Sequence, residues 1–144
     1  MREIKWIVAH CTASSPTATV ERIQNYWKEH LGWKSPGYHK IIGRNGEIHE
    51  LLPDDKVSNG VGGGYNTNSL NVSYIGGIDK DGKAIDNRTE EQKASMELVI
   101  TEWKKKYPDA EILGHRDFWF IYKYKGARKA CPCYDSIEEY AHIK

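Results

Sequence analysis

Short apolar, β-branched runs alternate with segments of helical periodicity along this chain, and this alternation constrains the fold most. Residues 4–9 have the character of a buried strand, as do residues 70–78 and 111–113. Between these runs, Thr19 and Thr89 each stand where a helix N-cap is expected. The pattern predicts an α/β (α+β) fold with a central mixed β-sheet flanked by helices.

A hairpin and a Gly-rich loop separate the first helix from the next long strand. Asn45-Gly46 lies between the stretches 38–43 and 47–51, and this dipeptide is typical of a tight hairpin turn. Residues 58–68 are rich in glycine and asparagine, and loops of this length in a compact domain often serve a function. A last helix is expected to begin near Asp135. With 144 residues and no linker or repeat, the chain is predicted to form one domain over residues 1–144.

The composition argues against several kinds of partner. A formal net charge of +1 lacks the basic balance typical of nucleic-acid binding, so no nucleic acid is expected. No stretch approaches the roughly 20 apolar residues that a membrane span needs, and the first residues do not have the pattern of a signal peptide. Three cysteines exclude a complete internal disulfide framework and favour reduced thiols and synthesis in the cytoplasm. We expect a monomer with no membrane partner.

Three residues with metal-binding side chains follow the predicted strands. His10 comes directly after residues 4–9, His115 follows residues 111–113, and Cys131 lies one loop further on. Strand ends of one sheet converge, so these side chains can meet. Two imidazoles and one thiolate suit a single Zn²⁺ and leave a fourth position for water, as in catalytic sites. The alternative is that each histidine is an ordinary surface or core residue, and spacing alone favours that alternative.

Seven short motifs then occur in a fixed order. They are Val-Ala-His-Cys-Thr-Ala-Ser at 8–14, Gly-Trp to Gly-Tyr-His at 32–39, Gly-Arg-Asn-Gly at 43–46, Gly-Tyr-Asn-Thr-Asn-Ser at 64–69, Ile-Gly-Gly-Ile-Asp at 75–79, Gly-His-Arg-Asp at 114–117 and Lys-Ala-Cys-Pro at 129–132. Together they resemble the zinc N-acetylmuramoyl-L-alanine amidases of type 2, especially bacteriophage lysozymes of the amidase kind. Peptidoglycan recognition proteins are more distant relatives. The resemblance covers nearly the whole chain, from residue 4 to residue 135.

The resemblance implies roles for five residues. It places Zn²⁺ on His10, His115 and Cys131, and it implies that Tyr38 and Lys129 are catalytic. The chemistry agrees, because a fixed cation can stabilise the oxyanion of amide hydrolysis and a tyrosine hydroxyl can pass a proton to the leaving amine. From the residues alone, Lys129 is better explained as a solvated surface lysine, and Tyr38 equally well as a core aromatic.

Arg44, Asn66 and Asn68 are weaker candidates for binding the stem peptide, the peptide part of peptidoglycan. The chain also departs from shorter relatives between Asp117 and Arg128, where residues 118–125 are aromatic and basic. This insertion is expected either to form a wall that contacts the substrate or to pack on the sheet as a hydrophobic flap. Its place between two predicted ligands favours the wall.

Three neighbours of these residues have other expected roles. Strand alternation turns His39 away from Tyr38, so a structural hydrogen bond is its expected role. Cys11 follows a ligand but points the other way, and we interpret it as a buried free thiol. Cys133 is interpreted as a buried or half-buried thiol, with competition for the metal as the alternative.

The sequence thus predicts a zinc hydrolase that cleaves N-acetylmuramic acid from L-alanine in peptidoglycan. Without a recognisable signal peptide, it is expected to be a phage or prophage endolysin that is made in the cytoplasm and acts on the cell wall after release. The alternatives are a cytoplasmic amidase of wall recycling, a non-catalytic peptidoglycan-recognition module, and a thiol-redox or structural zinc protein that uses Cys131 and Cys133.

Overall fold

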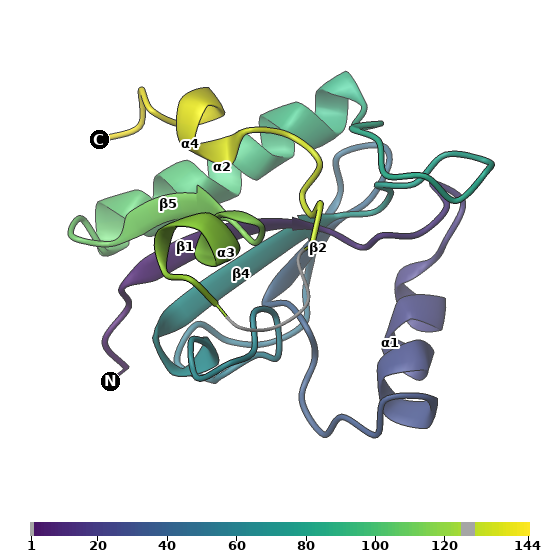
Figure 1. Ribbon diagram of the computed structural model, residues 1–144, viewed down its shortest axis with the longest axis horizontal. Helices are drawn as coiled ribbons and strands as arrows, with labels where there is room; N and C mark the ends of the chain where they lie inside the picture. Colours follow the sequence, from purple (N-terminus) through teal and green to yellow (C-terminus); the bar gives the residue numbers. More distant parts are fainter. Residues whose placement is uncertain (1, 125–128) are drawn as a thin grey trace.

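A computed structural model describes residues 2–124 and 129–144, and its centre is one five-stranded sheet (Figure 1). The strands are β1 (Trp6–Cys11), β2 (Lys40–Ile42), β3 (Ile48–Glu50), β4 (Ser69–Tyr74) and β5 (Glu111–Gly114). Their order across the sheet is β3-β2-β4-β1-β5. All neighbours run parallel except β2 and β3, which form an antiparallel hairpin. The mixed sheet of the predicted α/β fold is therefore confirmed.

Four α-helices connect or follow these strands within the described residues. They are α1 (Val20–Glu29), α2 (Glu90–Lys106), α3 (Asp117–Ile121) and α4 (Ser136–Glu139), and a 3-10 helix covers Asn66–Asn68. The predicted caps are confirmed. The Thr19 side chain accepts a hydrogen bond from the backbone of Arg22, and Thr89 forms a capping box with Gln92. None of the described helices has the length and apolar character needed to cross a membrane.

The core lies between the sheet and α2. Apolar side chains of β1 and β4 pack against Met96, Ile100 and Trp103 of α2, which lies along one face of the sheet (Figure 1). On the opposite face, Val8 and Leu113 pack with Phe118. Because β1 is covered on both faces, its sequence is almost uniformly apolar, as expected for a central parallel strand.

Among the strand boundaries that differ from the prediction, two affect the site. The first strand extends to Cys11, because His10 pairs with Ser73 and Cys11 with Tyr74 in the parallel ladder. His10 thus lies within β1 and not beyond its end. Strand β4 stops at Tyr74, since Gly76 and Gly77 have φ angles of 143° and 104°, which extended strands do not adopt.

A buried ion-pair network fixes the C-terminal part of the chain to the rest of the domain. The guanidinium of Arg88 donates to Glu139 in α4 at 2.6 and 2.9 Å and to Asp86 at 2.9 Å. It also lies over the ring of Tyr134, 3.4 Å from the centroid. Since the Arg88 side chain is almost completely buried, these contacts supply the partners that its charge requires.

Candidate metal centre

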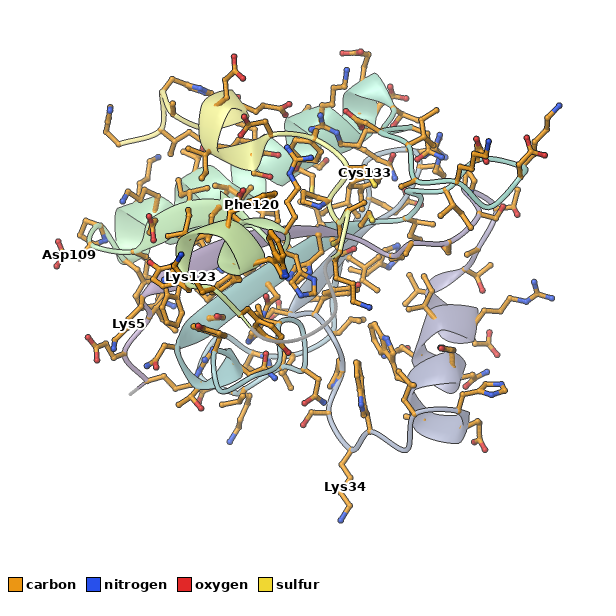
Figure 2. The ribbon with its side chains drawn as sticks, viewed as in Figure 1. Lys5, Lys34, Asp109, Phe120, Lys123 and Cys133 are labelled. Carbon is orange, nitrogen blue, oxygen red and sulfur yellow. The ribbon has the colours of Figure 1, made fainter. Side chains whose placement is uncertain are left out.

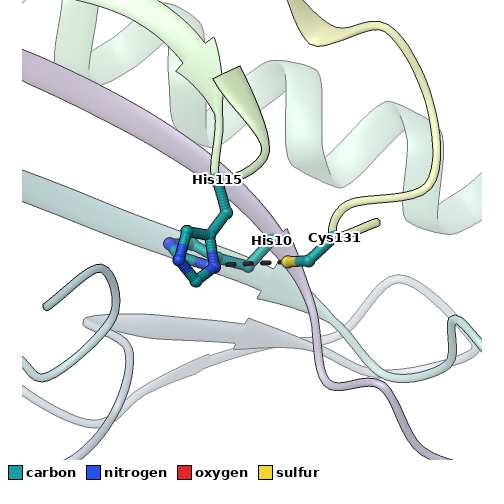
Figure 3. Close-up of side chains that lie close together, drawn as sticks. All are labelled: His10, His115 and Cys131. Atoms are coloured by element: carbon teal, nitrogen blue, oxygen red, sulfur yellow. Dashed lines mark hydrogen bonds between the residues drawn. The ribbon is translucent and has the colours of Figure 1, made fainter. Parts of the chain in front are cut away.

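His10, His115 and Cys131 come together at one edge of the sheet (Figure 3). His10 lies near the carboxyl end of β1, and His115 follows the adjacent parallel strand β5. Cys131 approaches from the loop that leads to α4. One potential ligand atom from each side chain lies within 4.8 Å of the other two, the only such group among the described residues. The structure therefore brings together the three ligands that the sequence predicts.

The orientation of His10 is fixed by a buried hydrogen-bond chain. The Nε2 of His10 is 2.7 Å from Oδ1 of Asn71, and Nδ2 of Asn71 donates to Oγ of Ser58 at 2.8 Å. Because the amide oxygen can only accept, His10 carries its proton on Nε2 and keeps the Nδ1 lone pair free. Nδ1 faces the sulfur of Cys131 at 3.7 Å. A metal-binding histidine typically has such a partner on its other nitrogen.

Gly60 makes room for this chain. A Cβ atom at position 60 would lie 2.6–2.9 Å from the side-chain amide atoms of Asn71, closer than real contacts allow. The Gly-rich loop therefore serves the site indirectly, because its close approach helps to hold Asn71 against His10.

Both imidazoles are neutral around pH 7. Burial, and then the positive charge of Lys129, lower the pKa of His115 to about 4, and a hydrogen bond to the backbone of Val61 opposes them in part. Burial, followed by the proximity of His115, holds the pKa of His10 well below its usual value. A histidine must be neutral to bind a metal, so desolvation prepares both rings for that role.

The sulfur of Cys131 has a hydrogen-bond donor directed at it. The backbone N–H of Cys11 donates to Sγ of Cys131 at 3.2 Å. A main-chain donor of this kind suits a thiolate ligand, because it compensates part of the negative charge without adding a competing side chain. Strand β1 therefore contributes both a predicted ligand, His10, and a hydrogen bond to a second predicted ligand, Cys131.

One distance within the cluster suits a tetrahedral metal. Ligand atoms about 2.0–2.3 Å from zinc lie roughly 3.3–3.8 Å apart at tetrahedral angles. The distance of 3.7 Å between Nδ1 of His10 and Sγ of Cys131 falls in this range. Three protein ligands leave one coordination position for water or substrate, which distinguishes a catalytic site from a closed structural one.

Tyr38 borders the cluster from the segment before β2. Its ring centroid lies 4.9 Å from that of His10, and its hydroxyl donates to the carbonyl of Cys11 at 3.1 Å. Burial, and then the proximity of Cys131, raises the pKa of the Tyr38 hydroxyl well above its usual value. Tyr38 therefore keeps its proton around neutral pH.

Lys129 lies at the mouth of the site. It is exposed and lines a cavity of about 180 Å³ together with His115 and Val61. The same lysine borders a larger cleft of about 530 Å³, whose other walls include Arg116 and Phe120. Lys129 and His115 therefore face a common space.

The three residues predicted to hold the stem peptide are engaged within the protein. One guanidinium nitrogen of Arg44 donates to the carbonyl of Asn87 at 2.8 Å and to the side chain of Gln92 at 3.0 Å. Asn66 accepts from two backbone amides of its own loop, and Asn68 donates to the carbonyl of Glu3. In this structure the three side chains therefore stabilise the fold.

The insertion after Asp117 packs on the sheet in part and borders a cleft in part. Phe118 is fully buried, and Tyr122 packs edge-on against Trp6, so much of the segment is a flap on the sheet. Phe120 is 52% exposed on α3 and lines the larger cleft, as a wall would (Figure 2). Lys125 and Arg128, which belong to the same insertion, lie outside the described residues.

His39 and the two remaining cysteines have the expected surroundings. The ring of His39 is buried, accepts from the backbone of Asn71 at Nδ1 and lies 2.8 Å from the carbonyl of Lys56 at Nε2. These bonds give it a structural role. Cys11 is a buried free thiol, and Cys133 is a half-buried one.

Sequence reasoning missed Asn71, Ser58 and Arg116. Asn71 lies in the middle of the fully buried strand β4, and a buried amide requires hydrogen-bond partners, so a prediction of burial there would have pointed to it. Ser58 lies in a loop, and Arg116 lies beside a predicted ligand. At neither position can periodicity or burial be inferred from sequence.

Comparisons with known proteins agree with this site. Residues 1–134 match the family of N-acetylmuramoyl-L-alanine amidases. The chain is 34% identical over 135 residues to an endolysin of Klebsiella phage KP32, covering 93% of this chain and 83% of the relative. It is 35% identical over 130 residues to an endolysin of Escherichia phage T7, covering 90% and 80%.

The fold is similar to that of an endolysin from the Thermus scotoductus bacteriophage Ph2119, with a TM-score of 0.77, 22% identity, and coverage of 99% of this chain and 86% of that one. Three findings lead to one conclusion. They are the metal-compatible cluster at the carboxyl ends of the strands, the family match over most of the chain and this extended similarity. The chain belongs to the N-acetylmuramoyl-L-alanine amidase family and is an enzyme that hydrolyses peptidoglycan.

Proposed function

We propose that this amidase cleaves the amide between N-acetylmuramic acid and L-alanine with one Zn²⁺ held by His10, His115 and Cys131. The convergence of these three ligand atoms within 4.8 Å carries the proposal. A bound zinc ion would polarise the scissile carbonyl and supply hydroxide at neutral pH. Neutral imidazoles and a hydrogen-bonded sulfur make this cluster ready to accept the ion.

Lys129 is proposed to stabilise the negative charge that develops on the carbonyl oxygen. Its ammonium group shares a cavity with His115 and is close enough to lower the pKa of that ring. Removing one oxyanion-stabilising donor typically lowers kcat by about 10²–10³. A neutral residue of similar length, as in Lys129→Gln, is expected to lower kcat on that scale.

Tyr38 is proposed to donate a hydrogen bond to the reacting amide. Its hydroxyl stays protonated because burial raises its pKa. In the described state the proton is directed at the carbonyl of Cys11. A small rotation of the side chain would turn it toward the substrate, where it can assist departure of the amine. Tyr38→Phe removes only this oxygen and is the variant to test.

The biological role proposed is that of an endolysin, which acts as a single catalytic domain and a monomer on the cell wall after release from the cytoplasm. Two relatives with at least 34% identity are endolysins of phages. Their names make whole sacculi the expected substrate, in preference to soluble fragments. Parallel assays on intact sacculi and on soluble muropeptides would separate lysis from wall recycling.

The test of the catalytic proposal is release of peptide from purified peptidoglycan. We expect release by the zinc-loaded protein, loss of release after chelation, and recovery when Zn²⁺ is returned. Lys129→Gln is compared with Lys123→Gln, which changes another exposed lysine nearby that does not line the cavity. Unchanged peptide release from zinc-free protein would refute the requirement for the metal. Equal rates in the two lysine variants would refute the role of Lys129. Muropeptide binding without any release would favour a recognition module.

A further inference from the structure

The three cysteines of this chain gather in one place, although only Cys131 belongs to the metal cluster. The sulfur of Cys11 lies 3.9 Å from that of Cys133, and the backbone of Cys11 donates to the sulfur of Cys131. Cys11 and Cys133 are 122 positions apart in sequence, so their meeting depends on the complete fold. Neither thiol is needed by the proposed mechanism.

We propose that Cys11 and Cys133 form a site of oxidative modification, at which a mild oxidant joins them in an intramolecular disulfide while Cys131 remains a ligand. The two side chains lie on one side of β1 and His10 lies on the other. The crosslink can therefore form without taking a ligand from the metal.

The space around the two sulfurs favours this pair. Gly77 leaves room for Cys11, because a Cβ at position 77 would lie 2.5 Å from its sulfur. The thiol of Cys133 is directed at the carbonyl of Gly77 at 3.5 Å, so both sulfurs rest against the same glycine. A disulfide bond is about 2.05 Å long, so the sulfurs must approach by only about 1.9 Å.

The difference in exposure sets the order of the reaction. Cys133 is half-buried on the segment that leads to α4 (Figure 2), whereas Cys11 is 3% exposed. Hydrogen peroxide would oxidise the Cys133 thiol to a sulfenic acid and release one water. The Cys11 sulfur would then attack the sulfenic sulfur, form the S–S bond and release a second water. Burial slows the first step, so the reaction needs excess oxidant and time.

The crosslink would join β1 to the segment that bears Cys131. Because it closes a loop of more than one hundred residues, it restricts the unfolded chain strongly. We therefore expect the oxidised protein to unfold at a temperature at least about 5 °C higher than the reduced protein. The role given to Cys131 rests on the proposed metal site, but this expectation requires no catalytic activity, so it can fail or hold independently of amide hydrolysis.

The experiment treats the full-length, zinc-loaded protein with excess hydrogen peroxide and maps its peptides without reduction. We expect a peptide containing Cys11 to be joined through Cys133, with cleavage before Pro132 in the mass spectrum distinguishing Cys133 from Cys131. The Cys133→Ser variant should lose both the crosslink and the rise in unfolding temperature, and Cys11→Ala should lose them as well. Folding of each variant is checked by its circular dichroism.

Four results would overturn the proposal. They are a crosslink through Cys131, a crosslink between two molecules, oxidation that stops at the sulfenic or sulfinic acid of Cys133, and a crosslinked protein that unfolds at the same temperature as the reduced one. A rise in unfolding temperature that persists in oxidised, folded Cys133→Ser would also overturn it.

Discussion

Replacement of Asn71 by leucine removes the acceptor that orients His10 while keeping a side chain of similar size. Asn71 and His10 are both completely buried, so water cannot replace the lost hydrogen-bond partner. The 2.7 Å contact to Nε2 of His10 disappears, and a buried N–H is left unsatisfied. Such a donor costs about 1–3 kcal/mol.

The same contact gives an independent estimate for metal binding. Loss of a hydrogen-bond partner of a metal-binding histidine typically weakens metal affinity about 10–100-fold. This corresponds to about 1.4–2.8 kcal/mol, which agrees with the cost of the unsatisfied N–H. We therefore expect Asn71→Leu to bind Zn²⁺ more weakly by this factor.

The assay is competition for Zn²⁺ between the protein and a chromophoric chelator, with urea unfolding of the metal-free protein as a check on folding. Ser58→Ala is the matched control, because it removes the outer bond to Asn71 and leaves the acceptor for His10 in place. Asn71→Asp keeps an acceptor and should recover part of the affinity. If folded Asn71→Leu binds Zn²⁺ as tightly as Ser58→Ala, the hydrogen bond does not position the ligand and the reasoning is wrong.

Further perturbations test the surroundings of the site. Gly60→Ala places a Cβ within 2.6–2.9 Å of the Asn71 amide, so it should weaken Zn²⁺ binding about tenfold in the same chelator assay; unchanged affinity would show that the loop adapts. Burial lowers the pKa of His39 from 6.5 to about 4, so as the pH falls His39 is protonated in the unfolded chain at a higher pH than in the folded chain. The free energy of unfolding should therefore decline between pH 6.5 and about 4, by up to about 3 kcal/mol from this group, and urea titrations of folded His39→Gln should show a smaller decline. Arg88→Met leaves two partly exposed carboxylates without their buried partner, so urea unfolding should show a free energy of unfolding lower by about 2–3 kcal/mol. A loss below about 1 kcal/mol would mean that water replaces the ion pairs.

Much of this architecture can be predicted from local sequence. Thr19 and Thr89 were recognisable as caps because a hydroxyl followed by a helical pattern satisfies the first backbone amides of a helix. The convergence of His10 and His115 followed from parallel strands that end at one sheet edge. These features depend on residues near in sequence or on general rules of sheet geometry.

The remaining features depend on contacts that only the folded chain makes. The register of β1 against β4 places His10 inside the strand, and no local pattern encodes a register. Arg44 is a weak candidate for substrate contact by sequence, and no local pattern predicts its hydrogen bonds to the carbonyl of Asn87 and the side chain of Gln92. Long polar side chains have many possible partners, so their choice is decided by tertiary structure.

The three ligand atoms meet from residues 10, 115 and 131, and this order has a consequence for synthesis. A ribosome releases the first ligand early and the last one near the end of translation, so a nascent chain holds no complete site until its final segment has emerged. A chain broken by a protease between residues 10 and 131 loses the covalent link between its ligands, and neither fragment contains all three. The proposed metal site can therefore form only in chains that extend at least to residue 131, and shorter products lack one of its three predicted ligands.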